Sequence, residues 1–320
     1  MLYLINLFSS NFTSFLGILV AFLLTCFSMQ KFSRLLPTDK GREFAHDGVL
    51  SAGKPRGAGF LFILVFVITV LIFGQLRRES IIYLVLVAAA MMTGFLDDCA
   101  KTSWGEYKKG FLDLLIAVMV AVTYLNFNSN EIYIAFLQTT VTIPVVVFGL
   151  LIVILVWTSI NVTNCADGVD GLSGTLTIIT LMSIYVINQL TGMESSFTYY
   201  ILIFSVCILG YLWYNATPSH LMMGDAGSRA MGLFISIAIL KTQRPLLYLL
   251  VAIVLILDGG LGLLKVSLLR FLKIRILKNT TTPLHDHVRK KLGWSGPQTV
   301  FRFAILQIIF SVAAVYLVLS

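Results

Sequence analysis

The positions of the acidic residues constrain this chain more than any other feature. The chain has 320 residues and only fifteen Asp and Glu, and long apolar runs separate the short groups in which most of these acids lie. Because alternate loops of a chain that crosses a bilayer repeatedly lie on one side, acids confined to odd-numbered loops would all face one membrane surface. Nine acids follow the first, third, fifth, seventh and ninth apolar runs: Asp39, Glu43, Asp47, Asp97, Asp98, Asp167, Asp170, Asp225 and Asp286.

The composition agrees with a chain that spans a membrane many times. Hydrophobic residues make up 58% of the chain and charged residues 12%, and the mean hydropathy is +0.92. A helix needs about 20 apolar residues to cross a bilayer, and continuous apolar runs favour helices over barrel strands. We therefore predict an all-α integral membrane protein, a single polytopic domain over residues 1–320 with about ten transmembrane helices. The predicted spans are 12–32, 58–76, 80–97, 111–127, 141–160, 172–190, 199–214, 229–240, 245–268 and 299–319.

The basic residues predict the orientation of the chain. Of 23 Lys and Arg, only Arg77, Arg78, Lys241 and Arg244 lie in even-numbered loops. The positive-inside rule then places the odd-numbered loops in the cytoplasm and both termini outside it. The net charge of +8 is explained by Lys and Arg at an anionic leaflet, so membrane lipids are expected partners and nucleic acid is not.

Two adjacent acids, Asp97 and Asp98, end the third apolar run, and Lys101 follows them. On a continuing helix, one Lys ammonium group would reach both carboxylates. Adjacent carboxylates repel each other unless a cation lies nearby, so this group predicts a metal ion or a cationic ligand. A simple salt bridge at the helix end is the alternative interpretation.

A second polar group recurs at every third residue after the fifth apolar run. At a helix end these side chains would form one stripe, and the glycines that follow its two aspartates would let the backbone approach a ligand closely. Amides and carboxylates together can bind a hydrated cation, ribose hydroxyls or the edge of a base, whereas a plain loop is the alternative. The members of the group are Asn161, Asn164, Asp167 and Asp170.

Asp225 lies in the segment Gly-Asp-Ala-Gly-Ser at 224–228, in front of a predicted helix, and Asn215 and Met222 precede it in the same loop. A carboxylate beside the free N–H groups of a helix N-terminus is suited to phosphate and metal binding, although a capped turn would look the same. Because Asp and Asn oxygens predominate in these loops, a hard cation such as Mg²⁺ is favoured, with Asp225 as its predicted ligand.

The ninth loop contains His285 and His287 on either side of Asp286, followed by three basic residues. Two imidazoles next to several cations suit a diphosphate, and zinc is less favoured because a catalytic zinc site normally has three protein ligands. If the segment is extended or tightly turned, the two histidines point one way and Asp286 the other. Asp286 is then expected to pair with Arg289 or Lys290.

Two further acids lie inside apolar runs. Asp258 lies in the ninth run and is followed by Gly259, Gly260 and Gly262. We expect it to cap the second fragment of a broken helix, with a catalytic role as the alternative. Asp113 begins the fourth run and is expected to pair with Lys108 or Lys109.

In these loops the chain resembles the polyprenyl-phosphate N-acetylhexosamine-1-phosphate transferases. The resemblance covers most of the chain and rests on D-D-x-x-K at 97–101, N-x-x-N-x-x-D-G-x-D-G-L at 161–172, M-G-D-x-G-S at 223–228 and the loop at 283–294. That last loop is similar to the one in members that transfer phospho-MurNAc-pentapeptide. The chain departs from the family pattern in three places: Asp286 replaces a histidine, Met222 replaces an aromatic residue, and Pro55-Arg56-Gly57-Ala58-Gly59 stands near the usual T-P-T-M-G-G.

The resemblance implies transfer of phospho-MurNAc-pentapeptide from UDP-MurNAc-pentapeptide to undecaprenyl phosphate in the bacterial plasma (inner) membrane. The products would be lipid I and UMP, and the cofactor Mg²⁺. The implied catalytic residues are Asp97, Asp98, Asp167, Asp225, His285 and His287, and the implied substrate-binding residues are Lys101, Asn161, Asn164, Asp170, Asn215 and Met222.

Two other functions remain as alternatives. A sister transferase would move GlcNAc-1-phosphate or a related sugar phosphate. A cation transporter would place its carboxylates near the middle of the bilayer, whereas these lie mainly at span ends. The sequence leaves open the oligomeric state (a homodimer included), the peptide variant of the donor, and whether the reaction passes through a covalent enzyme intermediate.

Overall fold

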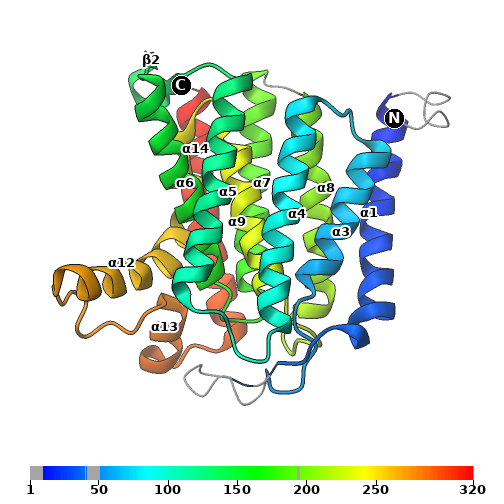
Figure 1. The fold of residues 1–320 in the computed structure, drawn as a ribbon, viewed down its shortest axis with the longest axis vertical. Helices are drawn as coiled ribbons and strands as arrows, with labels where there is room; N and C mark the ends of the chain where they lie inside the picture. The colour runs from blue at the N-terminus through cyan, green and yellow to red at the C-terminus, as the bar shows by residue number, and fades with distance from the viewer. Residues whose placement is uncertain (1–9, 40, 42–50, 193–194, 320) are drawn as a thin grey trace.

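The protein is a bundle of helices (Figure 1), seen in a computed structural model that describes residues 10–39, 41, 51–192 and 195–319. Glu43 and Asp47 of the first polar loop lie outside the described residues. Each predicted span contains helix, so the helical fold class is confirmed. The long helices are α1 (Ser10–Phe32), α3 (Gly59–Phe73), α4 (Arg78–Cys99), α5 (Glu106–Phe127), α6 (Val145–Cys165), α7 (Leu172–Thr191), α8 (Ser195–Asn215), α9 (Gly224–Leu240) and α14 (Gly296–Leu319).

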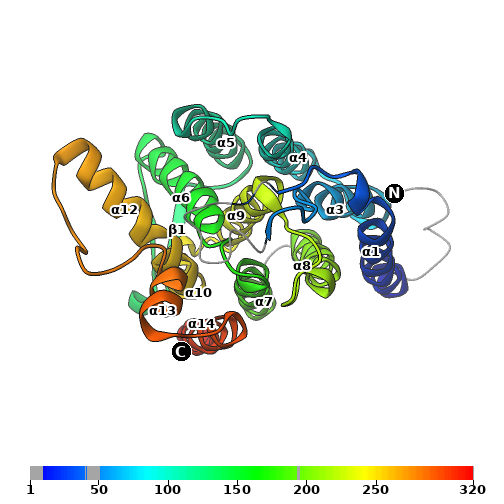
Figure 2. The ribbon, with the colours of Figure 1, turned by 90° about the horizontal axis from the view of Figure 1, so that it is seen from below.

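Between α9 and α14 the chain forms a bent segment and a short helix. The bent segment comprises the 3-10 turn Pro245–Leu247, α10 (Tyr248–Val251), α11 (Ile253–Leu255), the π-helical turn Ile256–Gly260, α12 (Leu261–Ser267) and a second π-helical turn, Leu268–Leu272. Its two parts, Pro245–Val251 and Ile253–Leu272, meet at an angle of 72°. The short helix is α13 (Leu284–Leu292). In Figures 1 and 2, α12 leaves the bundle sideways.

Among the described residues, seven helices are long and apolar enough to cross a membrane, or eight if the bent segment counts as one span. The remaining two are short: α3 has 15 residues and α9 has 17. The chain is therefore a multi-pass membrane protein, whereas ten crossings stay a prediction. In Figure 1, α1 begins and α14 ends at the same end of the bundle, opposite α13 and the acidic loops.

Helix α9 lies at the centre of the bundle (Figure 2), and all of its residues are buried. It packs against α3, α4, α6 and α7. Glycines make this packing possible: a Cβ at Gly59 would lie 2.0 Å from the backbone N of Gly227, and one at Gly94 would lie 2.4 Å from the carbonyl O of Asp225. Small residues let helix backbones approach closely in membrane bundles. The N-terminus of α9 is thus fixed between α3 and α4.

A buried ion pair joins α9 to α5. Arg229 Nε donates to Asp113 Oδ1 at 3.1 Å, and Arg229 Nη2 donates to the same oxygen and to the carbonyl O of Lys109. The predicted pairing of Asp113 with Lys108 or Lys109 was therefore wrong, because α5 turns Asp113 toward α9 and not along its own surface. An unpaired buried charge is strongly destabilising, so this pair fixes the position of α9 along α5.

The chain between α5 and α6 departs from the all-α prediction. Strands β1 (Glu131–Ile134) and β2 (Thr139–Thr142) form an antiparallel hairpin in which Glu131 lies opposite Thr142. The fifth helix therefore begins at Val145, after Pro144, and not at 141 as predicted. Four β-branched or threonine residues in a row, from 139 to 142, favour extended backbone. At its other end α6 continues to Cys165, which places Asn161 and Asn164 on the helix.

Candidate active site

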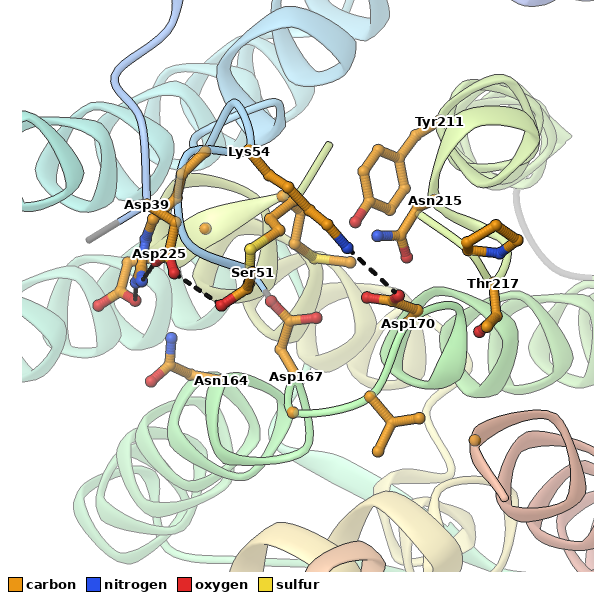
Figure 3. Close-up of a pocket in the computed structure, with 18 of the residues that line it drawn as sticks. Asp39, Ser51, Lys54, Asn164, Asp167, Asp170, Tyr211, Asn215, Thr217 and Asp225 are labelled. Atoms are coloured by element: carbon orange, nitrogen blue, oxygen red, sulfur yellow. Dashed lines mark hydrogen bonds and ion pairs between the residues drawn. The ribbon is translucent and has the colours of Figure 1, made fainter. Parts of the chain in front are cut away.

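A cavity of about 430 Å³ opens among the loops that carry the acidic groups (Figure 3). Its volume lies within the range of about 300–1,000 Å³ that is typical of small-molecule sites. The wall is built from chain segments far apart in the sequence, between Asp39 and Gly296. Six of the predicted site residues line it: Asn164, Asp167, Asp170, Asn215, Met222 and Asp225.

Asp225 lies at one end of the cavity, and two cations hold its carboxylate. Arg56 Nη2 contacts Oδ1 at 3.3 Å, and Lys109 Nζ of α5 contacts Oδ2 at 2.9 Å. Gly224 adopts a left-handed backbone conformation with φ of 68°, which L side chains rarely adopt. It turns the chain into α9 so that Asp225 lies in the first helical turn, where a negative charge is stabilised by the helix dipole.

Asp97 and Asp98 lie behind Asp225 and are not among the described residues that line the cavity. The Asp98 carboxylate accepts hydrogen bonds from the backbone N–H groups of Asp225 at 3.2 Å and Ala226 at 3.1 Å. A carboxylate of α4 therefore caps the N-terminus of α9. Asp97 pairs with Lys109 and accepts the backbone N–H of Trp104 at 2.6 Å. Both acids position Asp225 and its cations in this structure.

Lys101 does not occupy the expected position. Helix α4 ends at Cys99, so the continuing helix that would have placed Lys101 one turn after Asp97 does not form. Lys101 is exposed in a bend instead. The described ion pairs of the two acids come from Arg56 and Lys109, which sequence reasoning missed because both are distant in the chain.

Arg56 connects three carboxylates from three segments of the chain. Its Nε donates to Asp98 Oδ1 at 2.8 Å and its Nη1 donates to Asp39 Oδ1 at 3.0 Å, in addition to the contact with Asp225. Burial by itself would lower the pKa of Arg56, but Asp98, Asp225 and Asp39 outweigh burial and raise that pKa. The guanidinium is therefore charged at any physiological pH.

Asp39 is ionised as well. Burial would raise the pKa of its carboxyl group, but hydrogen bonds from Ser51, Arg56 and the backbone N–H of Gly41 outweigh burial and lower it. Ser51 Oγ donates to Asp39 Oδ2 at 2.8 Å, and Gly41 N donates to the same oxygen at 3.1 Å.

The other end of the cavity is lined by amide, hydroxyl and aromatic side chains (Figure 3). Asn215 Oδ1 accepts from the backbone N of Gly171 at 2.8 Å, and its Nδ2 donates to the carbonyl O of Leu221 at 2.9 Å. Asn215 thus ties the loop after α6 to the loop before α9. Asp170 accepts from the backbone N of Ser219 at 3.3 Å, and Lys54 Nζ lies 4.0 Å from its Oδ2.

The predicted polar stripe only partly faces the cavity. Asn164 and Asp167 line it, and Asn164 Nδ2 donates to Ser228 Oγ of α9 at 2.9 Å. Asn161 instead donates to the carbonyl O of Trp157 at 2.8 Å and lies 3.5 Å from Asp113. Its amide therefore serves the packing of α6 against α5.

Met222 also lines the cavity, and its backbone builds the wall. Its N–H donates to the carbonyl O of Pro55 at 2.8 Å, its carbonyl O accepts from Ala58 N at 3.0 Å, and it pairs with Arg56 in a short parallel bridge. The segment that departs from the family pattern is thus hydrogen-bonded to the loop that carries Asp225.

The two histidines lie beside the cavity on α13, so the prediction of an extended His-Asp-His segment was wrong. Asp258 Oδ1 accepts the backbone N–H of His285 at 2.7 Å, and Asp258 Oδ2 lies 2.8 Å from His285 Nδ1. Asp258 therefore caps α13, and not a fragment of its own helix as predicted. With Nδ1 donating to this carboxylate, His285 Nε2 is the ring nitrogen that faces Gly168.

His287 is turned toward the loop before α13, where its Nδ1 accepts from Thr281 N at 3.2 Å. Helix α13 brings Arg289, and neither histidine, into the described lining of the cavity. Asp286 pairs with Lys290 at 2.8 Å, which confirms one of the two predicted partners. The role of both histidines at a diphosphate or sugar stays a prediction.

The donor set fits one magnesium ion. Among the described residues, no three His, Cys, Asp or Glu side chains converge as a metal cluster, but Mg²⁺ usually takes only one or two carboxylates together with water and substrate phosphates. Counted in their formal ionised states, Asp39, Asp97, Asp98 and Asp225 contribute four negative charges, and Arg56 and Lys109 contribute two positive charges. The formal charge of these six side chains is therefore −2, which one divalent cation would neutralise.

Comparison with known proteins identifies the family. Residues 80–243 match the model of glycosyl transferase family 4, a region that contains Asp97, Asp98, Asp167 and Asp225. The phospho-N-acetylmuramoyl-pentapeptide-transferase of Treponema pallidum (strain Nichols) is 42% identical over 295 residues, which cover 86% of this chain and 80% of the relative. The chain belongs to glycosyl transferase family 4, and to the phospho-N-acetylmuramoyl-pentapeptide-transferases.

More distant relatives of the same name match as well. The protein of Clostridium acetobutylicum is 27% identical over 311 residues, covering 93% of this chain and 96% of the relative. The protein from the Wolbachia of Drosophila simulans (strain wRi) is 27% identical over 272 residues, covering 81% and 82% of the two chains. The family resemblance inferred from four loop motifs is therefore confirmed.

Proposed function

We propose that the protein transfers phospho-MurNAc-pentapeptide from UDP-MurNAc-pentapeptide to undecaprenyl phosphate, releasing UMP and forming lipid I for peptidoglycan synthesis. The observation that carries the proposal is a cavity at one end of a membrane bundle that is lined by Asp225 together with three basic residues, Lys54, Arg56 and Arg289. Two anionic substrates must approach each other in this reaction, and preorganised cations offset their repulsion. The names of the relatives supply the identity of the sugar.

The donor would lie along the cavity. Its nucleotide would occupy the end lined by Tyr211, Asn215 and Thr217, and its diphosphate would lie near Lys54 and Arg289. In the reaction a phosphate oxygen of the acceptor forms a bond to the phosphorus that carries the sugar, the bond between the two donor phosphates breaks, and UMP leaves with the electron pair. The pentapeptide would extend from the cavity toward the cytoplasm.

Mg²⁺ is part of the proposal, with Asp225 as its ligand. When bound, the ion would neutralise charge on the diphosphate. Asp167 lines the cavity between its two ends (Figure 3) and would orient the reacting groups there. The family resemblance implied that Asp97 and Asp98 are catalytic. Their contacts with the α9 N-terminus and Lys109 favour positioning of Asp225 as their role.

The acceptor would arrive along the bent segment. Leu264, Leu269, Phe271 and Leu272 are exposed there, interleaved with Lys265, Arg270 and Lys273. A helix of this composition, leaving the bundle sideways, suits the boundary between lipid and water. We further propose that the cavity faces the cytoplasm of a bacterial plasma membrane, with ten crossings and both termini outside.

One assay tests the function. The purified full-length protein in nanodiscs receives undecaprenyl phosphate and either UDP-MurNAc-pentapeptide or UDP-GlcNAc, with Mg²⁺ or with EDTA, and UMP release is measured. Release only with the MurNAc donor and Mg²⁺ supports the proposal. Release only with UDP-GlcNAc would assign the sister activity instead, and release in EDTA would overturn the metal requirement.

The same assay separates donor from acceptor contacts. His287→Ala should raise the KM for the donor more than that for undecaprenyl phosphate. A rise in the acceptor KM alone would assign α13 to the acceptor.

A further inference from the structure

Arg56 lies in the segment Pro55-Arg56-Gly57-Ala58-Gly59, one of the three places where the chain departs from the family pattern. Its guanidinium contacts Asp39, Asp98 and Asp225 with three different nitrogen atoms, and its side chain is 15% exposed. The backbone around it is held on both sides, since Arg56 N donates to the carbonyl O of Pro37 at 2.7 Å and the residue pairs with Met222. Any change in its contacts must therefore come from the side chain.

The two oxygens of Asp225 face different surroundings. Oδ2 is bound by Lys109, which is not among the described residues that line the cavity, whereas Oδ1 is bound by Arg56, which does line it. Oδ1 is therefore the oxygen that a cation entering from the cavity meets first. Such a cation and the Nη2 group of Arg56 need the same oxygen.

The three contacts of Arg56 are unequal. The contact with Asp225 is the longest at 3.3 Å, compared with 3.0 Å to Asp39 and 2.8 Å to Asp98. Long ion pairs contribute less than short ones, so the link to Asp225 is the easiest to break. Asp39 and Asp98 would keep the guanidinium in the site after that link is broken.

We propose that Arg56 is a resident cation that competes with the divalent metal ion for Asp225 Oδ1. Without the metal ion it suppresses the repulsion between Asp98 and Asp225, and when the metal ion binds it retains Asp39 and Asp98 and releases Asp225. Arg56 thereby sets the metal concentration that the site requires. This inference rests on the proposed function only for the identity of the metal ligand.

The test is the binding of Mn²⁺, a paramagnetic substitute for Mg²⁺, to the purified full-length protein without substrates, followed by electron paramagnetic resonance. Removing a like charge lowers the free-energy cost of bringing in a second cation, so Arg56→Gln should bind Mn²⁺ at least about 10-fold more tightly than the wild type. Arg56→Lys keeps the charge and should stay within about 3-fold of the wild type. Asp225→Asn, which lacks the proposed metal ligand, gives the Mn²⁺ affinity expected when the site is lost.

Lys54→Gln is the matched control. It removes the same charge from the same cavity, but Lys54 contacts Asp170 and Ser219 and has no described contact with Asp225. Its Mn²⁺ affinity should change less than about 3-fold, as expected for a charge without direct contact. A second measurement is the unfolding temperature, which Mn²⁺ should raise more in Arg56→Gln than in the wild type, because tighter binding stabilises the folded state more.

Unchanged or weaker Mn²⁺ binding in folded Arg56→Gln would overturn the inference, and so would equal tightening in Lys54→Gln. The Mn²⁺ binding experiment and the UMP-release assay can fail independently. If Mn²⁺ binding behaves as expected but the wild type releases no UMP from either donor, the proposed function fails and the cation exchange stands. If UMP is released but Arg56→Gln gains no affinity, only the cation exchange fails.

Discussion

Two helices at the cavity, α9 and α13, begin in the same way. Each is capped by a carboxylate from a distant part of the chain: Asp98 accepts N–H groups of α9, and Asp258 accepts the N–H of His285 in α13. In both helices the second residue is a predicted catalytic group, Asp225 in one and His285 in the other. A distant cap thus fixes both a helix end and the side chain that starts it.

The two helices differ in how many other contacts hold them. Helix α9 has 17 buried residues, a buried ion pair to α5 and two cations on Asp225. Helix α13 has nine residues, of which only His285 and Arg289 are buried. The position of Asp225 is therefore supported by many contacts, whereas that of His285 depends mainly on Asp258. We expect loss of a cap to affect α13 more than α9.

The largest effect is expected at Asp225 itself. Asp225→Asn should lower the rate of UMP release about 10³-fold, because it removes the proposed ligand of the Mg²⁺ that would neutralise charge on the diphosphate. Folding should be intact, since α9 keeps its other contacts, and thermal unfolding checks this. The control is Glu106→Gln, which neutralises an acid in an exposed pair with Arg270. Its rate of UMP release should be close to that of the wild type. Near-normal turnover of Asp225→Asn at limiting Mg²⁺ would remove Asp225 as the ligand.

The two caps can be compared directly. Asp258→Asn should lower turnover about 10–100-fold, the usual effect of losing a residue that orients a functional histidine. Amide hydrogen exchange should become faster at residues 284–288, because the cap of α13 is lost. Asp98→Asn should speed exchange at 224–226 by less, since other contacts hold α9. Equal acceleration in both helices would contradict the difference that we draw between them.

The contact between Gly168 and His285 gives a smaller effect. A Cβ at Gly168 would lie 2.2 Å from His285 Nε2, and Asp258 prevents the ring from moving away. Gly168→Ala should therefore destabilise the protein by about 1–3 kcal/mol, as overpacking usually does, and reduce turnover. Gly110→Ala, whose Cβ would meet no atom nearer than 3.9 Å, is the control. The double variant Gly168→Ala/His285→Ala lacks the ring that the added Cβ would meet, so its free energy of unfolding should recover. If it does not recover, the strain lies at another contact.

The smallest effect is expected at Asp286. Its pair with Lys290, in which the Asp286 side chain is half-buried, spans one helical turn, and pairs of this spacing are worth only about 0.2–0.5 kcal/mol. Asp286→Ala and Asp286→His should both keep turnover within about 2-fold of the wild type, since a surface pair contributes little. His285→Ala should lose far more in the same assay. Complete loss of activity in folded Asp286→Ala would make this residue a functional group of the site.

The sequence alone predicted the helices and the end of the bundle at which the site lies. Continuous apolar runs of membrane length produce helices regardless of tertiary context, and the parity of the loops brings their acids to one end. Six of the twelve predicted site residues line the cavity for this reason. The motif at 223–228 also correctly predicted a helix that begins beside Asp225.

Tertiary structure decided which charges meet. Arg56 and Lys109 pair with Asp98 and Asp97 although both are distant from these acids in the chain, because α3 and α5 pack beside α4, which ends at Cys99. The partner of the His285 ring is Asp258, 27 residues away, a pairing that the local sequence did not indicate. Local patterns determine helices through short-range backbone interactions. The pairing of buried charges is determined by which helix faces pack together, and that depends on contacts across the whole chain.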